Sequence, residues 1–232
     1  MSDQLISDAA PARVLDLSKI NSLIIAGWAG RDTAAVEHHI VELEKLGVPR
    51  PASVPCFYQL GSHLLSSAPV LEEVGNTASG EVEAVLVFTD GDIFLTVGSD
   101  HTDRQLETVG IALSKQVCPK PAAREAWRFD DVKMHWDRIV LRSWALIEGE
   151  EVLYQEGRAA TNLDPDTLVS LFNTEAGVDG ESLPDGSAMF CGTLPTIGGI
   201  RPADSFRVEI EDPVLGRRIS HSYRCRHLPV AG

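Results

Sequence analysis

Glu81 and Glu83 are the residues whose spacing most directly suggests chemistry. They open an apolar run, EVEAVLVF, that predicts a strand. Side chains two positions apart project from the same face of a strand, so the two carboxylates lie side by side. Like charges this close repel, and a hard divalent cation such as Mg²⁺, which prefers carboxylate and water oxygens, relieves the repulsion. The alternative is a solvated strand face that carries two acids.

Asp100 is the residue that could complete a site with three carboxylates. It lies in VGSDHTDR, after a hairpin that is expected to begin at Glu81. A hairpin returns the chain to its starting end, so Asp100 can approach Glu81 and Glu83 and form a hard-metal site with open water positions. The alternative is that Asp100 lies in a polar turn and caps a helix over 102–113. Asp103 could be either the third carboxylate or the helix cap.

His39 and Glu42 are three positions apart on an expected helix, and this spacing makes them neighbours. A glutamate that holds an imidazole makes it a better base, so the pair could take a proton from water. The alternative is an exposed pair without a role. The adjacent His38 leaves open which histidine would be the base.

Gly192 and Thr193 lie in AMFCGTLPTIGGIRP, the segment densest in glycine and proline. Glycines let backbone N–H groups approach a ligand closely, although a structural turn is the alternative. Lys115 stands between an apolar stretch and a loop bounded by prolines, so it could face a pocket, whereas a surface lysine is the default. No GxSxG, HExxH, P-loop or dinucleotide-binding GxGxxG pattern is present.

These residues must be positioned by a β-rich α+β chain with few helices. The Asp-Gly pair between two apolar runs predicts a tight hairpin, and apolar residues at helical spacing predict two longer helices. We expect one domain over residues 1–232, with 1–20 as a lead-in. The expected elements are a strand at 21–27, a helix from Asp32 to Gly47 with a buried stripe of Val36, Ile40 and Leu43, a hairpin of 81–88 and 93–97, strands at 137–147 and 152–155, a helix capped by Asp164, and a strand at 205–211.

The charge balance excludes two classes of partner. The 232 residues carry 20 Lys+Arg against 34 Asp+Glu, a net charge of −14, which argues against nucleic acid and anionic membrane surfaces. Apolar runs are shorter than the roughly 20 residues of a membrane span, and the first residues do not read as a signal peptide. The four cysteines form no CxxC pair, so we expect reduced thiols in a cytoplasmic protein.

Six segments, taken in order, resemble the fumarylacetoacetate hydrolase superfamily. LIIAGWAGRDTAAVEHHIVE is similar to its early strand, its Gly-Arg-Asn-Tyr-like loop and its helix with His-x-x-Glu, and PCFYQLGSHLL to the segment that follows. EVEAVLV is similar to its Glu-x-Glu strand, and SDHTDRQLE to its Asn-Asp-Val-Ser-Ala-Arg-Asp segment. IVLRSWALIEGEEVLYQEGRAATNLDPDTLVSLF and CGTLPTIGGIRPADSFRVEIEDPVLGRRIS are similar to its later segments. The closing motif reads Gly-Thr-Leu-Pro in place of Thr-Gly-Thr-Pro. The variant motifs resemble still more closely a bacterial offshoot known only as a family of unknown function.

The resemblance implies a mixed β roll with few helices, usually a homodimer, and a site that uses Mg²⁺ or Mn²⁺. It covers most of residues 20–223 and carries over residue by residue. The implied roles are Glu81, Glu83 and Asp100 as metal ligands, His39 and Glu42 as the water-activating pair, Lys115 as the active-site lysine, and Arg31, Tyr58, Gly192 and Thr193 as substrate-binding residues.

The implied function is a metal-dependent hydrolase that cleaves a C–C bond in a 2-oxo acid or β-dicarbonyl, acylpyruvate-like substrate. The partner is then a small carboxylate. The superfamily also contains decarboxylases, isomerases and hydratases, so a metal-dependent lyase or isomerase is an alternative. A second alternative is a catalytically silent binding protein with the same fold.

Overall fold

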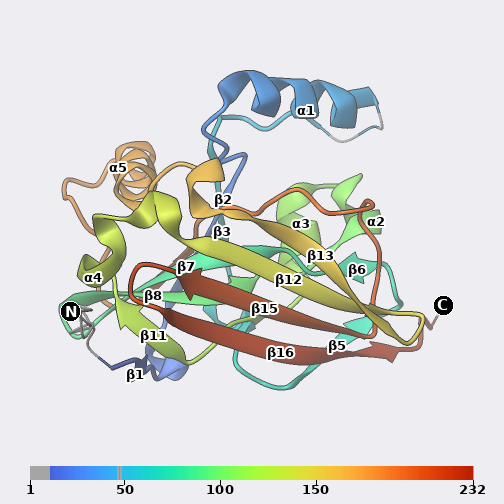
Figure 1. Cartoon of the computed structure of the whole chain (residues 1–232). Coiled ribbons are helices and arrows are strands. Elements are labelled where there is room, and N and C mark those ends of the chain that lie inside the picture. Colours follow the sequence, from blue (N-terminus) through green and yellow to red (C-terminus); the bar gives the residue numbers. More distant parts are fainter. Residues whose placement is uncertain (1–10, 46, 48, 232) are drawn as a thin grey trace, which may run out of the picture.

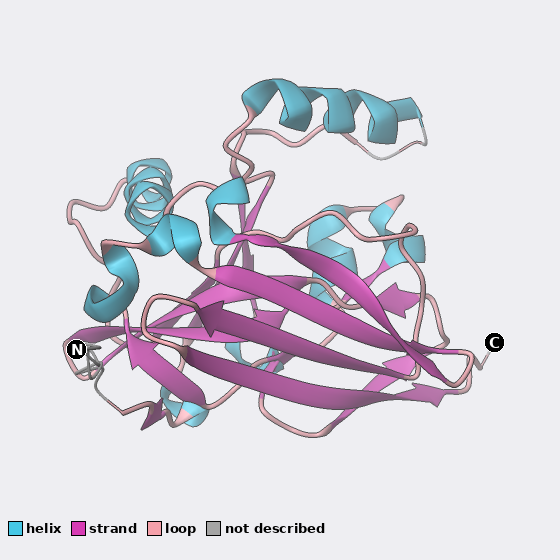
Figure 2. Ribbon diagram, viewed as in Figure 1, coloured by secondary structure: helices cyan, strands magenta, loops and turns pink. Residues whose placement is uncertain are grey.

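Sixteen β-strands and a few short helices form the part of the chain that the computed structural model describes, residues 11–45, 47 and 49–231 (Figures 1 and 2). The strands are β1 (Arg13–Val14), β2 (Ser22–Gly27), β3 (Cys56–Leu60), β4 (Leu65–Ser66), β5 (Val70–Val74), β6 (Ala78–Ser79), β7 (Val82–Thr89), β8 (Asp92–Ser99), β9 (Thr102–Asp103), β10 (Lys120–Pro121), β11 (Glu125–Arg128), β12 (Val140–Ile147), β13 (Glu150–Arg158), β14 (Ser187–Phe190), β15 (Ser205–Asp212) and β16 (Arg217–Leu228). The α-helices are α1 (Thr33–Lys45), α2 (Arg104–Glu107), α3 (Ile111–Gln116), α4 (Asp130–Lys133) and α5 (Pro165–Ala176). The predicted β-rich α+β class is confirmed. Residues 1–10 of the predicted lead-in lie outside the described residues.

Two main sheets pack against each other. One is seven-stranded, in the order β1-β11-β8-β7-β14-β2-β3, and the other is five-stranded, in the order β13-β12-β15-β16-β5. Leu86 of β7, Val97 of β8 and Ile210 of β15 share the apolar core between them. Phe190 of β14 and Ile25 of β2 belong to a second core on the other face of the seven-stranded sheet. Because β7 is buried along both faces, its sequence is a nearly continuous apolar run.

The hairpin of β7 and β8 forms as predicted. The strands pair antiparallel, and Thr89 lies opposite Asp92 at the turn. Asp90 and Gly91 have φ values of 55° and 75°. Two consecutive positive φ angles characterise the tight turn that Asp-Gly favours, because its twist matches that of the strands. The turn sets the register of the pair and therefore brings the start of β7 next to the end of β8.

Helix α1 begins where the sequence predicts. The Asp32 side chain accepts hydrogen bonds from the backbone N–H groups of Ala34 and Ala35, each at 3.0 Å. Ile40 is buried and Val36 is half-buried, whereas the side chain of Leu43 lies outside the described ones. Figure 1 shows α1 at the top of the view, away from the two main sheets and joined to the molecule next to β2.

The other helices are short except α5. The Asp164 side chain caps α5 by accepting from the Thr167 N–H at 3.0 Å, and Gly177 ends the helix with a φ of 66°. The single helix expected over 102–113 is instead two pieces, α2 and α3, which separate at Gly110. Among the described residues, no helix is both long and apolar enough to cross a membrane.

Candidate metal centre

Glu81, Glu83 and Asp100 come together at the open end of the β7–β8 hairpin, and we call them the acidic cluster. One carboxylate oxygen of each lies within 4.8 Å of the other two. The backbone fixes this arrangement, because Asp100 N–H donates to Glu81 C=O at 2.9 Å. Glu83 is 2% exposed and Asp100 is fully buried, so the solvated strand face considered above is excluded. Asp103, not Asp100, caps helix α2.

Three cationic side chains surround the acidic cluster. Lys115 Nζ donates to Asp100 and lies 3.9 Å from Glu81 Oε2. Lys120 Nζ lies 3.2 Å from Asp100 Oδ1, and the Arg104 guanidinium lies 3.0 Å from Glu81 Oε1. Both lysines are buried, which rules out a surface position for Lys115. The three cationic side chains thus pair with Glu81 and Asp100.

Burial and neighbouring charges shift the pKa values of Glu83 and Asp100 in opposite directions. Burial and then the charge of Asp100 raise the pKa of Glu83 well above its usual value. Burial acts in the same direction on Asp100, but Lys115 and Lys120 outweigh it and lower the pKa of Asp100 to about 2. Burial disfavours the charged form of Lys115, yet Asp100 and Glu81 raise its pKa overall. Asp100 is therefore the member that ionises most readily, and Glu83 is the one whose surroundings favour the protonated form.

A divalent cation fits the donors of the acidic cluster. Mg²⁺ is bound by oxygens at about 2.1 Å, so two of its ligands are at most about 4.2 Å apart. The three carboxylate oxygens here lie within 4.8 Å of one another. All three side chains offer carboxylate oxygens, the ligands that Mg²⁺ and Mn²⁺ prefer. Burial, followed by the negative charge of Asp100, raises the pKa of Glu83 more than the nearby charge of Lys115 lowers it. A cation next to Glu83 would favour its ionised form.

Gly192 and Thr193 are tied to strand β7. Gly192 N–H donates to Glu83 Oε2 at 2.8 Å, so this N–H is used inside the protein. Gly192 has a φ of 93°, and a Cβ there would lie 3.0 Å from the Ala29 Cβ, which explains the glycine. Thr193 Oγ1 donates to Val82 C=O at 3.0 Å. The closing segment therefore orients a carboxylate of the cluster, and contact of either residue with a substrate stays a prediction.

His39 and Glu42 lie outside the acidic cluster. Nδ1 of His39 is 3.8 Å from Oε2 of Glu42, and the two side chains are 60% and 54% exposed. His38 is equally close to Glu42, with Nδ1 3.7 Å from Oε1. The structure therefore brings the predicted pair together on α1 but does not decide between the two histidines.

Trp28 and Tyr58 connect this pair to the cluster. The rings of Trp28 and His39 are 5.8 Å apart, and Trp28 Nε1 donates to the Tyr58 hydroxyl at 3.1 Å. Lys115 Nζ in turn lies 5.9 Å from the centre of the Tyr58 ring. Trp28 has a φ of 59°, which is strained for a bulky residue and occurs mainly where function or packing requires it. Tyr58 thus lies between the helix pair and Lys115.

Arg31 pairs with Asp137, with 2.7 Å between Nη2 and Oδ1. Its backbone N–H donates to Thr161 C=O at 3.0 Å, and Asn162 Nδ2 donates to Thr193 C=O at 2.9 Å. The loop of Arg31 is thereby anchored next to the closing segment. No contact in the described residues joins its guanidinium to the acidic cluster, so its substrate role stays a prediction.

The family model described as "Protein of unknown function (DUF2848)" matches residues 26–223. The chain belongs to the DUF2848 family. No match was found among curated proteins. The family model therefore identifies the family of the chain, and solved structures identify its fold.

Solved structures, one of them of the fumarylacetoacetate hydrolase family, share the fold of this DUF2848 chain. Yeast ynq8, a fumarylacetoacetate hydrolase family protein, is 17% identical with a TM-score of 0.63, over 93% of this chain and 96% of that one. The 2-keto-3-deoxy-D-arabinonate dehydratase complexed with magnesium and 2,5-dioxopentanoate is 14% identical with a TM-score of 0.62, over 90% and 75%. The 4-oxalocrotonate decarboxylase from Pseudomonas putida G7, complexed with calcium and acetate, is 13% identical with a TM-score of 0.56, over 93% and 78%. The expected superfamily fold is confirmed.

Several residues near the DUF2848 site were not predicted from the sequence. Lys120 and Arg104 contact the acidic cluster, and Gln155 is buried behind it. Gln155 Oε1 accepts from Val82 N–H at 2.8 Å, and its Nε2 donates to Thr193 Oγ1 at 3.0 Å. Nothing in the sequence around Lys120 or Gln155 marked either residue as buried.

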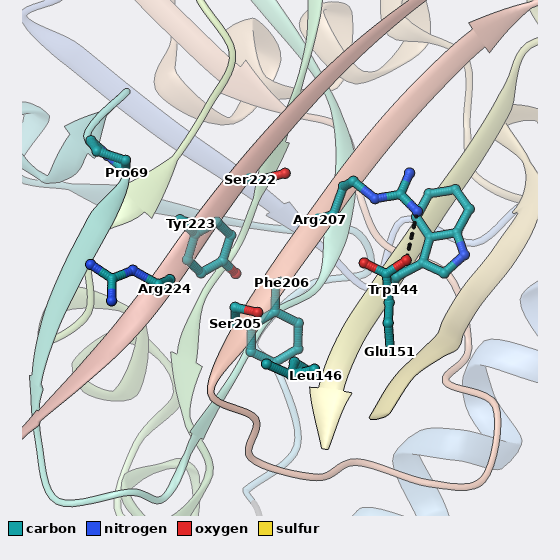
Figure 3. Close-up of a pocket in the computed structure, with 10 residues that line it drawn as sticks. All are labelled: Pro69, Trp144, Leu146, Glu151, Ser205, Phe206, Arg207, Ser222, Tyr223 and Arg224. Carbon is teal, nitrogen blue, oxygen red and sulfur yellow. Dashed lines mark hydrogen bonds and ion pairs between the residues drawn. The ribbon is translucent and has the colours of Figure 1, made fainter. Parts of the chain in front are cut away.

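A separate hollow of about 370 Å³ lies on the five-stranded sheet of this DUF2848 chain (Figure 3). Cζ of Arg207 lies 3.6 Å from the centre of the Trp144 ring, and its Nη2 lies 3.1 Å from Glu151 Oε1. Much of the charge of Arg207 is therefore already satisfied. The residues that line the hollow include none of the acidic cluster. We therefore place the candidate site at the cluster.

Proposed function

We propose that this protein is a divalent-metal-dependent enzyme that uses Mg²⁺ or Mn²⁺ and acts on a small 2-oxo acid or β-dicarbonyl compound. The observation that carries the proposal is the convergence of the three carboxylates of the acidic cluster beside a buried lysine. Neighbours with the same fold support it, because one is a dehydratase complexed with magnesium and another a decarboxylase complexed with calcium. We favour hydrolysis of a C–C bond in an acylpyruvate-like substrate.

The cluster would bind the cation through Glu81, Glu83 and Asp100. A cation held there supplies Lewis-acid polarisation of a substrate carboxylate and its neighbouring keto oxygen. Lys115 keeps its proton, because Asp100 and Glu81 favour the ammonium form. Its role is to stabilise negative charge that develops on the substrate.

His39 is assigned as the base that takes a proton from water, with Glu42 as the residue that orients its ring. The pair is exposed, so water reaches it freely. Trp28 and Tyr58, which lie between His39 and Lys115, would form the wall against which the substrate packs. The substrate would therefore lie between α1 and the acidic cluster.

The test combines metal binding with turnover. Wild-type protein and the variants Glu83→Gln and Glu125→Gln are assayed with Mg²⁺ and a panel of acylpyruvates. Glu125 is an exposed residue of β11 and serves as the matched control. We expect Glu83→Gln to lose both the thermal stabilisation by Mg²⁺ and the turnover, and Glu125→Gln to keep both. Retention of both properties in Glu83→Gln contradicts the assignment of the metal site.

A metal-dependent decarboxylase or other lyase is the second candidate. The position of His39 and Glu42 outside the acidic cluster favours it, because such a reaction needs the cation and Lys115 but no activated water. The two candidates differ in the product formed in ¹⁸O-labelled water. Hydrolysis places the label in a new carboxylate, whereas decarboxylation, isomerisation or dehydration does not create that carboxylate. A protein with the same fold but no metal-dependent turnover on any substrate of the panel fits the catalytically silent alternative.

A further inference from the structure

A second group of possible metal ligands lies next to the acidic cluster and differs from it in chemistry. Donor atoms of Glu73, His101 and Cys225 lie within 4.8 Å of one another. Glu73 and His101 are buried, and Cys225 is half-buried. His101 follows Asp100 directly, so the two groups meet at consecutive residues. The second group offers oxygen, nitrogen and sulfur, whereas the acidic cluster offers oxygen alone.

The strand register brings a fourth donor to this group. Strands β5 and β16 pair in parallel at the edge of the five-stranded sheet, with His227 opposite Glu73 (Figure 1). Cys225 and His227 are two positions apart on β16 and therefore project from the same face. Nδ1 of His227 lies 3.0 Å from Oε1 of Glu73. His227 thus adjoins the three-residue group through its contact with Glu73.

Glu73 is the buried centre of the group, and one of its oxygens is incompletely satisfied. Oε2 lies 2.8 Å from Nε2 of His101. Oε1 is buried and has no hydrogen-bond partner among the described residues, although the imidazole of His227 is close enough for an ion pair. A buried carboxylate oxygen without a hydrogen bond is costly unless a positive charge approaches it. This oxygen points to a cation.

His101 is held in the manner of a metal-bound histidine. Its Nδ1 is 3.2 Å from the Tyr223 hydroxyl, and that hydroxyl donates to Ser99 Oγ at 2.8 Å. Ligating histidines commonly use their second ring nitrogen in this way, which fixes the ring orientation. Nε2 now contacts Glu73 Oε2, and a bound cation would replace this contact. Ser99 Oγ also accepts from Glu81 N–H at 3.1 Å, so the chain of contacts reaches the acidic cluster.

We propose that Glu73, His101, Cys225 and His227 bind one borderline-soft divalent cation, of the chemical class of Zn²⁺. Four ligands of nitrogen, sulfur and oxygen type are the usual set for a tetrahedral zinc site. On binding, the Cys225 thiol releases its proton to solvent and coordinates as thiolate, so Cys225 and Glu73 together neutralise the charge of the cation. The partial exposure of Cys225 and His227 provides an entry path. The cation would fix β5, β16 and the segment that carries Asp100 relative to one another.

Cobalt reports on this site separately from the acidic cluster. The full-length protein is reduced, stripped of metal with a chelator and titrated with Co²⁺. A thiolate-to-cobalt charge-transfer band requires a sulfur ligand, so the all-oxygen cluster cannot produce it. We expect the band to saturate at one Co²⁺ per chain, to disappear on addition of Zn²⁺ and to persist in excess Mg²⁺. Absence of the band in the wild-type protein overturns the proposal.

Two matched pairs of variants assign the ligands. Cys225→Ser is compared with Cys56→Ser, another half-buried free cysteine that lies on β3. We expect the band to be lost in the first variant and kept in the second. Glu73→Gln is compared with the exposed Glu72→Gln, and we expect at least about tenfold weaker Co²⁺ binding only in the former.

Circular dichroism melting shows whether each variant folds, and Cys225→Ala replaces Cys225→Ser if the latter does not. A band of unchanged intensity in the folded Cys225 variant assigns the sulfur to another cysteine and overturns the proposal. The result is independent of the proposed enzymatic function, because Mg²⁺ binding is assigned to the three carboxylates of the acidic cluster alone.

Discussion

The acidic cluster and the His39–Glu42 pair experience opposite environments. Glu83 and Asp100 are buried, and Asp100 lies beside the ammonium groups of Lys115 and Lys120. His39 and Glu42 are more than half exposed on a helix that lies apart from the main sheets (Figure 1). The proposed metal ligands are therefore fixed by backbone pairing before any ligand binds. The proposed base, in contrast, depends on how α1 is placed relative to the substrate.

Asp100→Asn is expected to have the largest effect on stability. The change removes the charge that neutralises the buried Lys115 and Lys120, and breaking a buried ion pair costs about 3–5 kcal/mol. Chemical denaturation measures the change in the free energy of unfolding. Asp92→Asn is the control, because Asp92 pairs with Arg128 near the surface and should cost less than about 1 kcal/mol. Equal costs for the two variants would show that the burial of the cluster is not what stabilises it.

His39→Ala should affect turnover and leave stability nearly unchanged. Loss of a general base reduces the rate by about a hundredfold or more, whereas an exposed substitution changes the free energy of unfolding by less than about 0.5 kcal/mol. The stabilisation by Mg²⁺ should be retained. His38→Ala is the matched control on the same helix. If His38→Ala abolishes turnover instead, the base is the neighbouring histidine.

Gly192→Ala should destabilise the protein by about 1–3 kcal/mol, because a Cβ would add a close contact with Ala29 to an unfavourable positive φ. Gly199→Ala separates the two causes, since Gly199 has a φ of 85° and nothing within 4 Å of the added atom. We expect the first variant to lose more stability and to bind Mg²⁺ more weakly. Equal losses in thermal melts would attribute the effect to φ alone.

Mg²⁺ binding should become weaker as the pH falls. Glu83 has a raised pKa, so the folded, metal-free protein holds a proton there at pH values above the usual pKa of 4.5, and the cation must displace it. The apparent affinity should then change by up to about tenfold per pH unit below that raised pKa. Asp100, with a pKa of about 2, adds no dependence above about pH 4. Calorimetry in two buffers of different ionisation enthalpy measures the released proton, and zero release would contradict the prediction.

Local signals predicted much of the fold and the acidic cluster. The Asp90-Gly91 turn and the apolar runs beside it were sufficient to place β7 and β8 and, through them, Glu81 next to Asp100. The same reasoning could not find Lys120, because its burial depends on the pairing of β10 with β4, far away in the chain. Gly110 separates α2 from α3 in the segment expected to be one helix, because a glycine interrupts a helix more readily than it continues one.

The Glu73 group shows the limit of local reasoning most clearly. His101 Nε2 contacts Glu73 Oε2 in the folded chain. Cys225 joins them only when β16 pairs with β5. Neither strand has a metal-ligand spacing such as CxxC, which is the signal that sequence analysis depends on. The group is created by the sheet, so only the folded structure reveals it.

The position of β14 has a consequence for the order of assembly during synthesis. β14 lies between β7 and β2 in the seven-stranded sheet, although it follows them late in the chain. The N–H of Gly192 that binds Glu83 comes 109 residues after that glutamate. A growing chain can form the β7–β8 hairpin early, but it exposes unpaired edges of β2 and β7 until β14 is synthesised and inserted. We therefore expect slow, late completion of the sheet, with the acidic cluster reaching its final charge environment only in the last stage of folding.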